Sequence, residues 1–394
     1  MIDSIYIAET GLKGFEKGLQ NISSNTTNLD TPGFKASTTQ FADMFYNNDN
    51  PSNSGSSDLG QAGYGLNTLG TTINFAQGQF QSTGNSLDLA INGQGFFVLE
   101  DGNGKISYTQ DGQFKFDSND KLISSTTGEA VMARDGAGNL TPITLTDLKT
   151  GAAQATSTVV FTGNLSSSAT SDSVANVTVI DGAGSSHALT VNFAPVTGAA
   201  GSWTATVMDG TKTVGSGKIA FSSGQPVAGS NTVSLNYTPS GGTAIPLKLD
   251  FSSNVTSFDS GTSSSLAVAS QDGHVSGTLS NETFDSTGTL ILTYSNGQTV
   301  KNKQLALAQF SSVDNAQQQG SNEFTSVNGQ AWLTGVAGSG GFGAIQSGEV
   351  EMSNVDLSQQ FSDLVIMQRG YQASSQIVST ANDMLTTLFG MWSK

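Results

Sequence analysis

MSNVDLSQQFSDLVIMQRGYQASSQIVSTANDML, residues 352–385, stands near the end of a chain that is otherwise rich in glycine and serine. Ser353 is a typical helix N-cap residue, and Asp356 three residues later can close a capping box. The residues that follow repeat at alternating spacings of three and four, which predicts a helix with a coiled-coil seam. The members of this seam are Leu357, Phe361, Leu364, Gln368, Tyr371, Ser375, Val378, Asn382, Leu385, Phe389 and Trp392.

The first thirty residues carry the same alternation, so a second helix is predicted at the N-terminal end. Its seam consists of Ile5, Ala8, Leu12, Phe15, Leu19, Ile22, Thr26 and Leu29. Gly11, Gly14 and Gly18 lie inside this pattern, and each costs about 1 kcal/mol of helix propensity relative to alanine. We therefore expect both terminal helices to be marginal alone and to form when packed. They can pair with each other, pair with other copies of the chain, or simply dock on a core.

The composition excludes several classes of partner. The chain has 394 residues, 36% hydrophobic and 12% charged, with 47 glycines and a net charge of −16. This charge argues against a nucleic-acid or anionic-membrane surface. The two arginines, Arg134 and Arg369, leave little material for a phosphate clamp. Cysteine is absent, and the composition favours an extracellular β-rich protein.

The N-terminal segment MIDSIYIAETGLKGF lacks the early positive charge and long apolar core of a secretory signal peptide. The apolar run at residues 364–367 is far too short to span a bilayer. We therefore expect no membrane insertion, and an export route without a cleaved leader if the protein works outside the cell.

Between the two ends, turn signals alternate with short strand patterns. Residues 86–122 alternate apolar and polar residues between Asn-Gly, Asp-Gly and Ser-Asn pairs, which predicts β-hairpins. The predicted fold class is mainly β with α-helical termini. The predicted domains are a terminal helical coiled-coil domain (1–30 and 355–394), a connecting segment (31–70), an inner β domain (71–145 and 277–354) and an outer inserted β domain (146–276).

No group of residues predicts catalysis, a cofactor site or a metal site, so we expect a protein that is not an enzyme. His187 and His274 have no acidic residue at ligand spacing. The segments DGNGK (101–105) and DSNDK (117–121) resemble the start of calcium loops, but they lack the glycine at position six and the final glutamate. VGSGKI (214–219) lacks the residues of a phosphate-binding loop.

The two ends of the chain resemble those of a known family. LDTPGFK (29–35), directly after the N-terminal heptads, and residues 352–385 are similar to the terminal segments of bacterial flagellar axial proteins, the rod, hook and hook-associated subunits. SYTQDGQFKFD (107–117) and the run from YSNGQ to LALAQF (294–310) resemble the hook subunits in particular. The chain departs from the family pattern at Asn25-Thr26-Thr27-Asn28, at Asp30 and at Gln110.

The resemblance implies a structural subunit that polymerises through its terminal helices into the flagellar hook. This extracellular hollow tube acts as a universal joint between the basal-body rod and the filament. Pro32-Gly33 ends the first helix, and we expect it to act as a hinge or spacer. The predicted interface residues of the helices are Ile5, Leu12, Phe15, Leu19, Ile22, Leu29, Leu357, Phe361, Leu364, Gln368, Arg369, Tyr371, Val378, Leu385 and Phe389.

The resemblance also implies partners. The first is the chain itself, and the others are the distal rod, hook-cap, hook-length-control and hook–filament junction proteins and the flagellar type III export apparatus. Two alternatives stay open at this point. One is a distal-rod subunit, and the other is a secreted β-rich adhesin or enzyme with helical ends, which would need a binding groove or catalytic cluster in residues 146–276.

Overall fold

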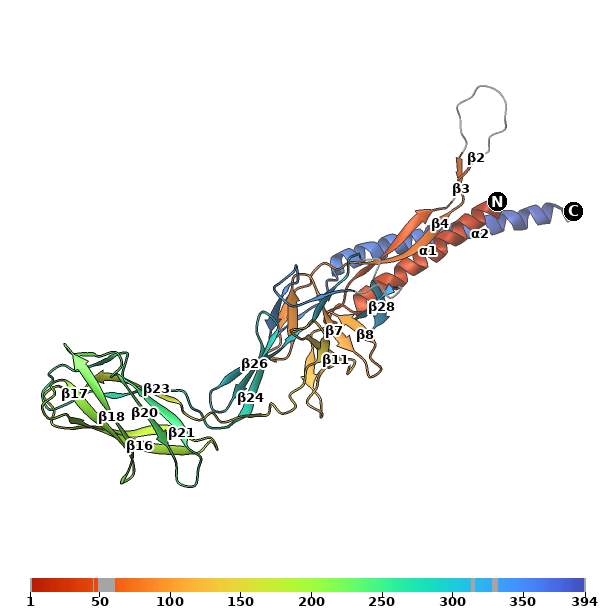
Figure 1. The fold of residues 1–394 in the computed structure, drawn as a ribbon. Coiled ribbons are helices and arrows are strands. Elements are labelled where there is room, and N and C mark those ends of the chain that lie inside the picture. Colours follow the sequence, from red (N-terminus) through yellow and green to blue (C-terminus); the bar gives the residue numbers. More distant parts are fainter. Residues whose placement is uncertain (1, 45, 49–60, 313–315, 328–331, 393–394) are drawn as a thin grey trace. The chain divides into compact units, whose positions relative to one another are not determined.

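The computed structural model describes residues 2–44, 46–48, 61–312, 316–327 and 332–392 (Figure 1). The chain divides into two compact units. Unit 1 comprises Met1–Thr146, Glu282–Ile291 and Lys301–Lys394, and unit 2 comprises Asp147–Asn281 and Leu292–Val300. The expected fold class, mainly β with a helix at each end, is confirmed.

Two helices of unit 1, α1 (Ile2–Thr27) and α2 (Leu357–Trp392), pack against each other (Figure 1). The cap of α2 differs from the prediction. Asp356 is the N-cap, because its Oδ1 accepts hydrogen bonds from the main-chain N–H groups of Ser358 (2.8 Å) and Gln359 (3.2 Å). Ser353 lies outside the helix, so the predicted capping box is wrong. An aspartate immediately before the first helical residue satisfies the free N–H groups without help from Ser353.

A β-ribbon lies along α1 where the sequence predicted only a connecting segment. Strands β1 (Ser37–Asp43) and β4 (Leu66–Ile73) pair antiparallel, with a bulge between Gln40 and Phe41, and both contact α1 (Figure 1). The short strands β2 (Tyr46–Asn48) and β3 (Gln61–Gly63) pair beyond them. Residues 49–60 of the predicted segment lie outside the described residues.

The β region of unit 1 is built around β7 (Phe96–Glu100), which pairs antiparallel with β8 (Ile106–Thr109), β11 (Ala130–Arg134) and β27 (Leu307–Gln309). Its aromatic core includes Phe96, Phe324 and Trp332, and the ring of Trp332 stacks on Tyr108 with centroids 4.0 Å apart. The other strands are β5 (Phe80–Ser82), β6 (Leu89–Asn92), β9 (Phe114–Phe116), β10 (Leu122–Ser124), β12 (Leu140–Pro142), β28 (Ala316–Gly320), β29 (Glu323–Ser326), β30 (Leu333–Gly335), β31 (Ala344–Ser347) and β32 (Glu349–Glu351).

Unit 2 is a β-sandwich. One sheet has the antiparallel order β15-β16-β17-β18-β19, and the other has the order β20-β21-β14-β22 with β23 beside β14. Buried side chains from both sheets, including Phe161, Phe193, Trp203 and Phe251, form one core. The strands are β13 (Thr150–Gly151), β14 (Thr158–Asn164), β15 (Asp172–Ile180), β16 (Ser186–Pro195), β17 (Ser202–Asp209), β18 (Lys212–Ser222), β19 (Gln225–Pro226), β20 (Thr232–Tyr237), β21 (Ile245–Asp250), β22 (Val255–Thr256) and β23 (Ala267–Gln271). VGSGKI lies within β18 and forms no loop.

Three further strands have residues in each unit: β24 (Gly277–Phe284), β25 (Thr289–Tyr294) and β26 (Thr299–Leu305).

The calcium-like motifs are hairpin turns. In DGNGK, Asp101 Oδ1 accepts the main-chain N–H groups of Asn103 and Lys105, both at 2.8 Å. Asp117 makes the same pair of bonds in DSNDK. The same turn, with its fourth residue at positive φ, recurs at residues 135–139, 181–185 and 285–289. These aspartates therefore use their carboxylates on the main chain of the turn itself.

Candidate subunit interface on the terminal helices

The two terminal helices run antiparallel in a fixed register. Near the end of α1, Asn25 Nδ2 donates to Gln360 Oε1 in the first turn of α2 (3.0 Å). Fourteen positions earlier on α1, Gly11 faces Ser374, which lies fourteen positions later on α2. The same two-heptad step on both helices keeps one face of α1 against one face of α2.

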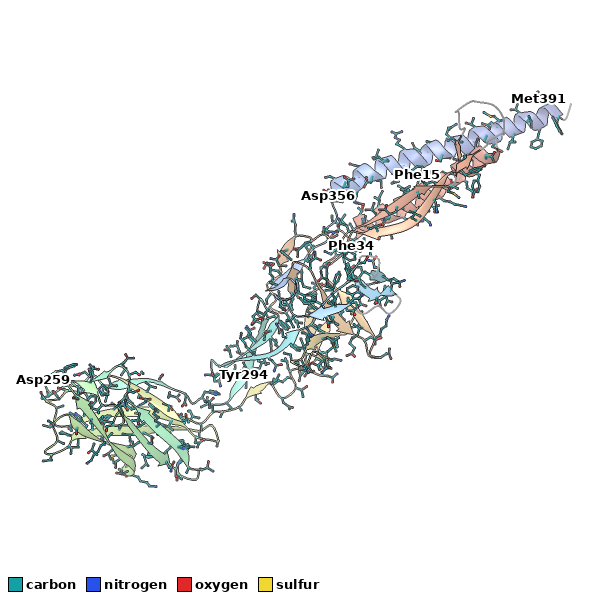
Figure 2. All side chains as sticks on the ribbon, turned by 45° about the horizontal axis from the view of Figure 1, so that its top comes forward. Phe15, Phe34, Asp259, Tyr294, Asp356 and Met391 are labelled. Carbon is teal, nitrogen blue, oxygen red and sulfur yellow. The ribbon has the colours of Figure 1, made fainter. Side chains whose placement is uncertain are left out.

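Glycines make this contact close. A Cβ built on Gly370 of α2 would lie 2.5 Å from the ring of Phe15, and one built on Gly18 would lie 2.9 Å from Met367 Sδ. The Phe15 ring also packs on Phe41 of β1, with centroids 6.5 Å apart. Phe15 therefore fills the space between α2 and the ribbon (Figure 2), and the glycines that weaken each helix are those that admit the neighbouring side chain.

The line of closest approach is offset from the predicted α1 seam. The α1 residues on this line are buried or contact α2, and they are Ala8, Gly11, Phe15, Gly18, Ile22 and Asn25. Leu12 and Leu19 are only half-buried, as are Ile5 and Leu29. Ala8, Phe15 and Ile22 of the predicted seam lie on this line, whereas Leu12 and Leu19 lie beside it. The spacing rule selected the largest apolar side chains, whereas close approach of two helices favours the smallest.

Most of α2 lies open to solvent. Among its described residues only Ala381 is buried. Phe361 is 59% exposed, Ile366 61% and Phe389 67%. Phe361 and Phe389 were predicted interface residues, and Ile366 was not. Of the remaining predicted interface residues of α2, Leu364, Val378 and Leu385 are half-buried, whereas Leu357, Gln368, Arg369 and Tyr371 are exposed. A row of apolar side chains this long, exposed along one helix, is typical of an interaction surface.

A polar network that the sequence reasoning missed fixes α1 to the ribbon. Asn25 is buried; its Nδ2 donates to the main-chain O of Ser37 (2.8 Å), and its Oδ1 accepts the N–H of Ser37 (3.0 Å). Asn21 Nδ2 also donates to the Ser37 carbonyl (2.9 Å). A buried polar group needs its hydrogen bonds satisfied, and Asn25 is satisfied by Ser37 of β1 together with Gln360 of α2. The sequence signal for this role was the position of Asn25, a polar residue on a helix face made of apolar and small residues.

A buried ion pair joins the segment after α1 to the strand before α2. Lys35 Nζ lies 2.6 Å from Glu351 Oε1, and both side chains are almost fully buried. The same carboxylate oxygen accepts the N–H of Gly78 (2.7 Å), and Lys35 also donates to the carbonyl of Ala76 (3.0 Å). Because each charge has an opposite charge and a main-chain partner, the cost of burying the two charges is offset.

Pro32 and Gly33, the predicted hinge or spacer, form a corner that is packed against other segments of the chain. Gly33 has φ +71°, and its N–H donates to the carbonyl of Glu351 (2.8 Å). A Cβ at Gly33 would lie 2.5 Å from the main-chain N of Asp111, and Asn322 Nδ2 donates to the carbonyl of Pro32 (2.8 Å). The two residues form a packed corner, held from three sides by segments distant in sequence.

Two parts of the chain match family models of flagellar axial proteins. Residues 346–391 match the family model described as flagellar basal body rod FlgEFG protein C-terminal. Residues 90–166 match the model described as flagellar hook protein FlgE/F/G D1 domain.

Relatives define the family more narrowly. The flagellar hook protein FlgE of Salmonella typhimurium is 33% identical, over 98% of this chain and 98% of the relative. FlgE of Borreliella burgdorferi is 29% identical over 98% of this chain and 99% of its own. The chain belongs to the flagellar hook protein family, and it is a structural subunit. The structure of Helicobacter pylori FlgE2 resembles it in fold, with a TM-score of 0.50 and 13% identity over 68% of this chain and 99% of that one.

None of the helices in the described residues is long and apolar enough to cross a membrane.

Proposed function

We propose that the chain polymerises through α1 and α2 into the extracellular hook of the bacterial flagellum. The observation that carries this proposal is the exposure of large apolar side chains along α2, a helix of 36 residues with one buried side chain among those described. Burying a leucine- or phenylalanine-sized side chain is worth roughly 1.5–3 kcal/mol. Covering residues such as Phe361, Ile366 and Phe389 therefore supplies a strong drive for association.

The geometry of the partner surfaces favours a filament. In this proposal the exposed side chains of α2 in one copy meet a different surface of the next copy. A heterologous contact whose rotation does not close generates a helical polymer. Helices that gain most of their packing on assembly would also keep free monomers from polymerising early.

The roles of the remaining parts are part of the same proposal. The terminal helices form the core domain of the tube, the β region of unit 1 the inner β domain, and unit 2 the outer domain whose sliding lets the tube bend as a universal joint. Export through the flagellar type III apparatus is proposed likewise. So are contacts with the distal rod, hook-cap, hook-length-control and hook–filament junction proteins.

Electron microscopy of the purified chain, concentrated at high salt with short polymer seeds, tests this function. Curved hollow tubes are the expected result, and straight tubes would indicate a distal-rod subunit instead. A variant that lacks residues 355–394 should keep both β regions folded, as judged by circular dichroism, but form no tubes. Tubes from the truncated chain would refute the role of α2.

A further inference from the structure

Helix α2 extends beyond the end of α1. Gly11 of α1 faces Ser374, and Ser4 lines the same pocket as Ala381 and Met384. Helix α1 begins at Ile2, so α2 has no partner from α1 over the rest of its length to Trp392. At 1.5 Å per residue, the eight residues after Met384 make an extension of roughly 12 Å.

The line of α2 residues that faces α1 continues onto this extension. Ala381, Met384, Leu388 and Met391 follow one another at spacings of three and four, the step that keeps residues on one face. Ala381 is 6% exposed, whereas Leu388 is 45% and Met391 74% exposed. We call the exposed residues Met384, Leu388, Met391 and Trp392 the tip; Figure 2 labels Met391 at this end. The tip thus continues an established helix–helix interface beyond the point where the partner ends.

A cleft lies at the opposite end of the same helix pair. It has a volume of about 780 Å³ and lies between the end of α1, residues 74–81 and the segment that leads into α2. Asp356 marks this end in Figure 2. Its apolar lining consists of Leu29, Ala76, Phe80, Met352, Val355 and Leu357. We call this feature the end cleft.

The end cleft also has a polar lining. It consists of the carboxylates Asp30 and Asp356 and of the neutral residues Asn74, Gln77, Gln79, Gln81, Ser353 and Asn354. An incoming α2 end brings apolar side chains, and these match the apolar part of the lining.

The tip cannot enter the end cleft of its own chain. Leu357 is the first residue of α2 and lines the cleft, whereas Trp392 is its last residue. A helix of 36 residues separates the two by roughly 50 Å. Any tip that fills the cleft must come from another copy of this chain.

We propose that the tip of one subunit inserts into the end cleft of the next, in a head-to-tail contact. The inference rests on the proposed polymerisation and deepens it by naming the two surfaces that meet. Because tip and cleft are different surfaces at opposite ends of one rigid helix pair, the contact repeats without closing and builds a row of subunits.

The chain contains no cysteine, which makes crosslinking a clean test. Met391→Cys and Leu357→Cys are prepared as separate full-length variants, mixed, assembled at high salt with seeds, and treated with a short thiol-to-thiol crosslinker. A crosslinked dimer in the mixture, and none from either variant alone, is expected. A chain that carries both cysteines should give a ladder of multimers. The matched control uses Ile366→Cys in place of Leu357→Cys. Ile366 is exposed in the middle of α2, so Ile366→Cys should not link to Met391→Cys.

The outcomes separate the inference from the function. One result would overturn the head-to-tail contact and leave polymerisation intact. In it, tubes form without a crosslink between Met391→Cys and Leu357→Cys, and Met391→Cys links instead to Tyr6→Cys on the side of α1. Absence of tubes from the unmodified chain would overturn the proposed function itself. If either cysteine variant fails to join tubes of the unmodified chain, Leu388→Cys with Leu29→Cys repeats the test at the same contact. No crosslink from that pair within tubes would also refute the inference.

Discussion

Replacing Gly370 by alanine tests the packing of the two helices most directly. The added Cβ would lie 2.5, 2.6 and 2.9 Å from three ring atoms of Phe15, a rigid side chain held between α2 and Phe41. Overpacking of this kind costs about 1–3 kcal/mol. Alanine is the better helix former by about 1 kcal/mol, so the net loss is smaller than the clash alone.

Gly390 supplies the matched control in the same helix. A Cβ there meets no atom within 4 Å, so Gly390→Ala keeps the gain in propensity without a clash. The two variants should therefore differ by the clash alone, about 1–3 kcal/mol. Amide hydrogen exchange of α2 in the full chain measures this difference. It corresponds to a roughly 5- to 150-fold difference between the two variants in the equilibrium constant for local opening of α2.

A second substitution checks the cause. In Gly370→Ala, the further change Phe15→Leu shortens the clashing side chain and should recover part of the lost protection. Equal stabilisation of α2 by Gly370→Ala and Gly390→Ala would refute the close contact between Phe15 and α2. So would the absence of any recovery in the double variant.

Three further predictions concern charge. Tube formation should strengthen with salt, because a net charge of −16 per subunit makes copies repel each other and salt screens that repulsion. Going from about 20 mM to about 500 mM salt shortens the Debye length about fivefold, so an equal critical concentration at the two salt concentrations would contradict this. Lys35→Met should lower the free energy of unfolding of the chain by about 3–5 kcal/mol, because it leaves the buried Glu351 carboxylate unpaired. The double variant Lys35→Met, Glu351→Leu should regain most of the lost free energy of unfolding, as measured by urea titration. Main-chain N–H groups hold the pKa of Asp101 and of Asp117 below the usual value. The two carboxylates therefore stabilise the folded chain above the unfolded-state pKa of about 4. This stabilisation is lost as the pH falls through the lower folded-state pKa. Thermal unfolding of the unmodified chain should show this loss, and the Asp101→Asn, Asp117→Asn variant should show a shallower dependence on pH.

Sequence alone determined the features that depend on neighbours along the chain. The spacing of three and four residues predicted a helix at each end, and the structure has α1 and α2 there. Turn residues predicted hairpins in residues 86–122, and β7 pairs with β8 as β9 pairs with β10. These signals are local, because a turn or a helical repeat is set by the backbone preferences of a few adjacent residues. The terminal segments also carried the resemblance that led to the family.

Only the tertiary structure decided which surfaces meet. Lys35 and Glu351 are 316 positions apart, and nothing local to either residue names the other. The leucines of α1 satisfied the spacing rule, but the helices approach along the glycines, because a backbone without side chains allows the nearest contact. The pairing of β1 with β4 and the packed corner at Gly33 likewise depend on segments that folding brings together. Local sequence fixes which elements form, and the packing of distant side chains selects the faces through which they join.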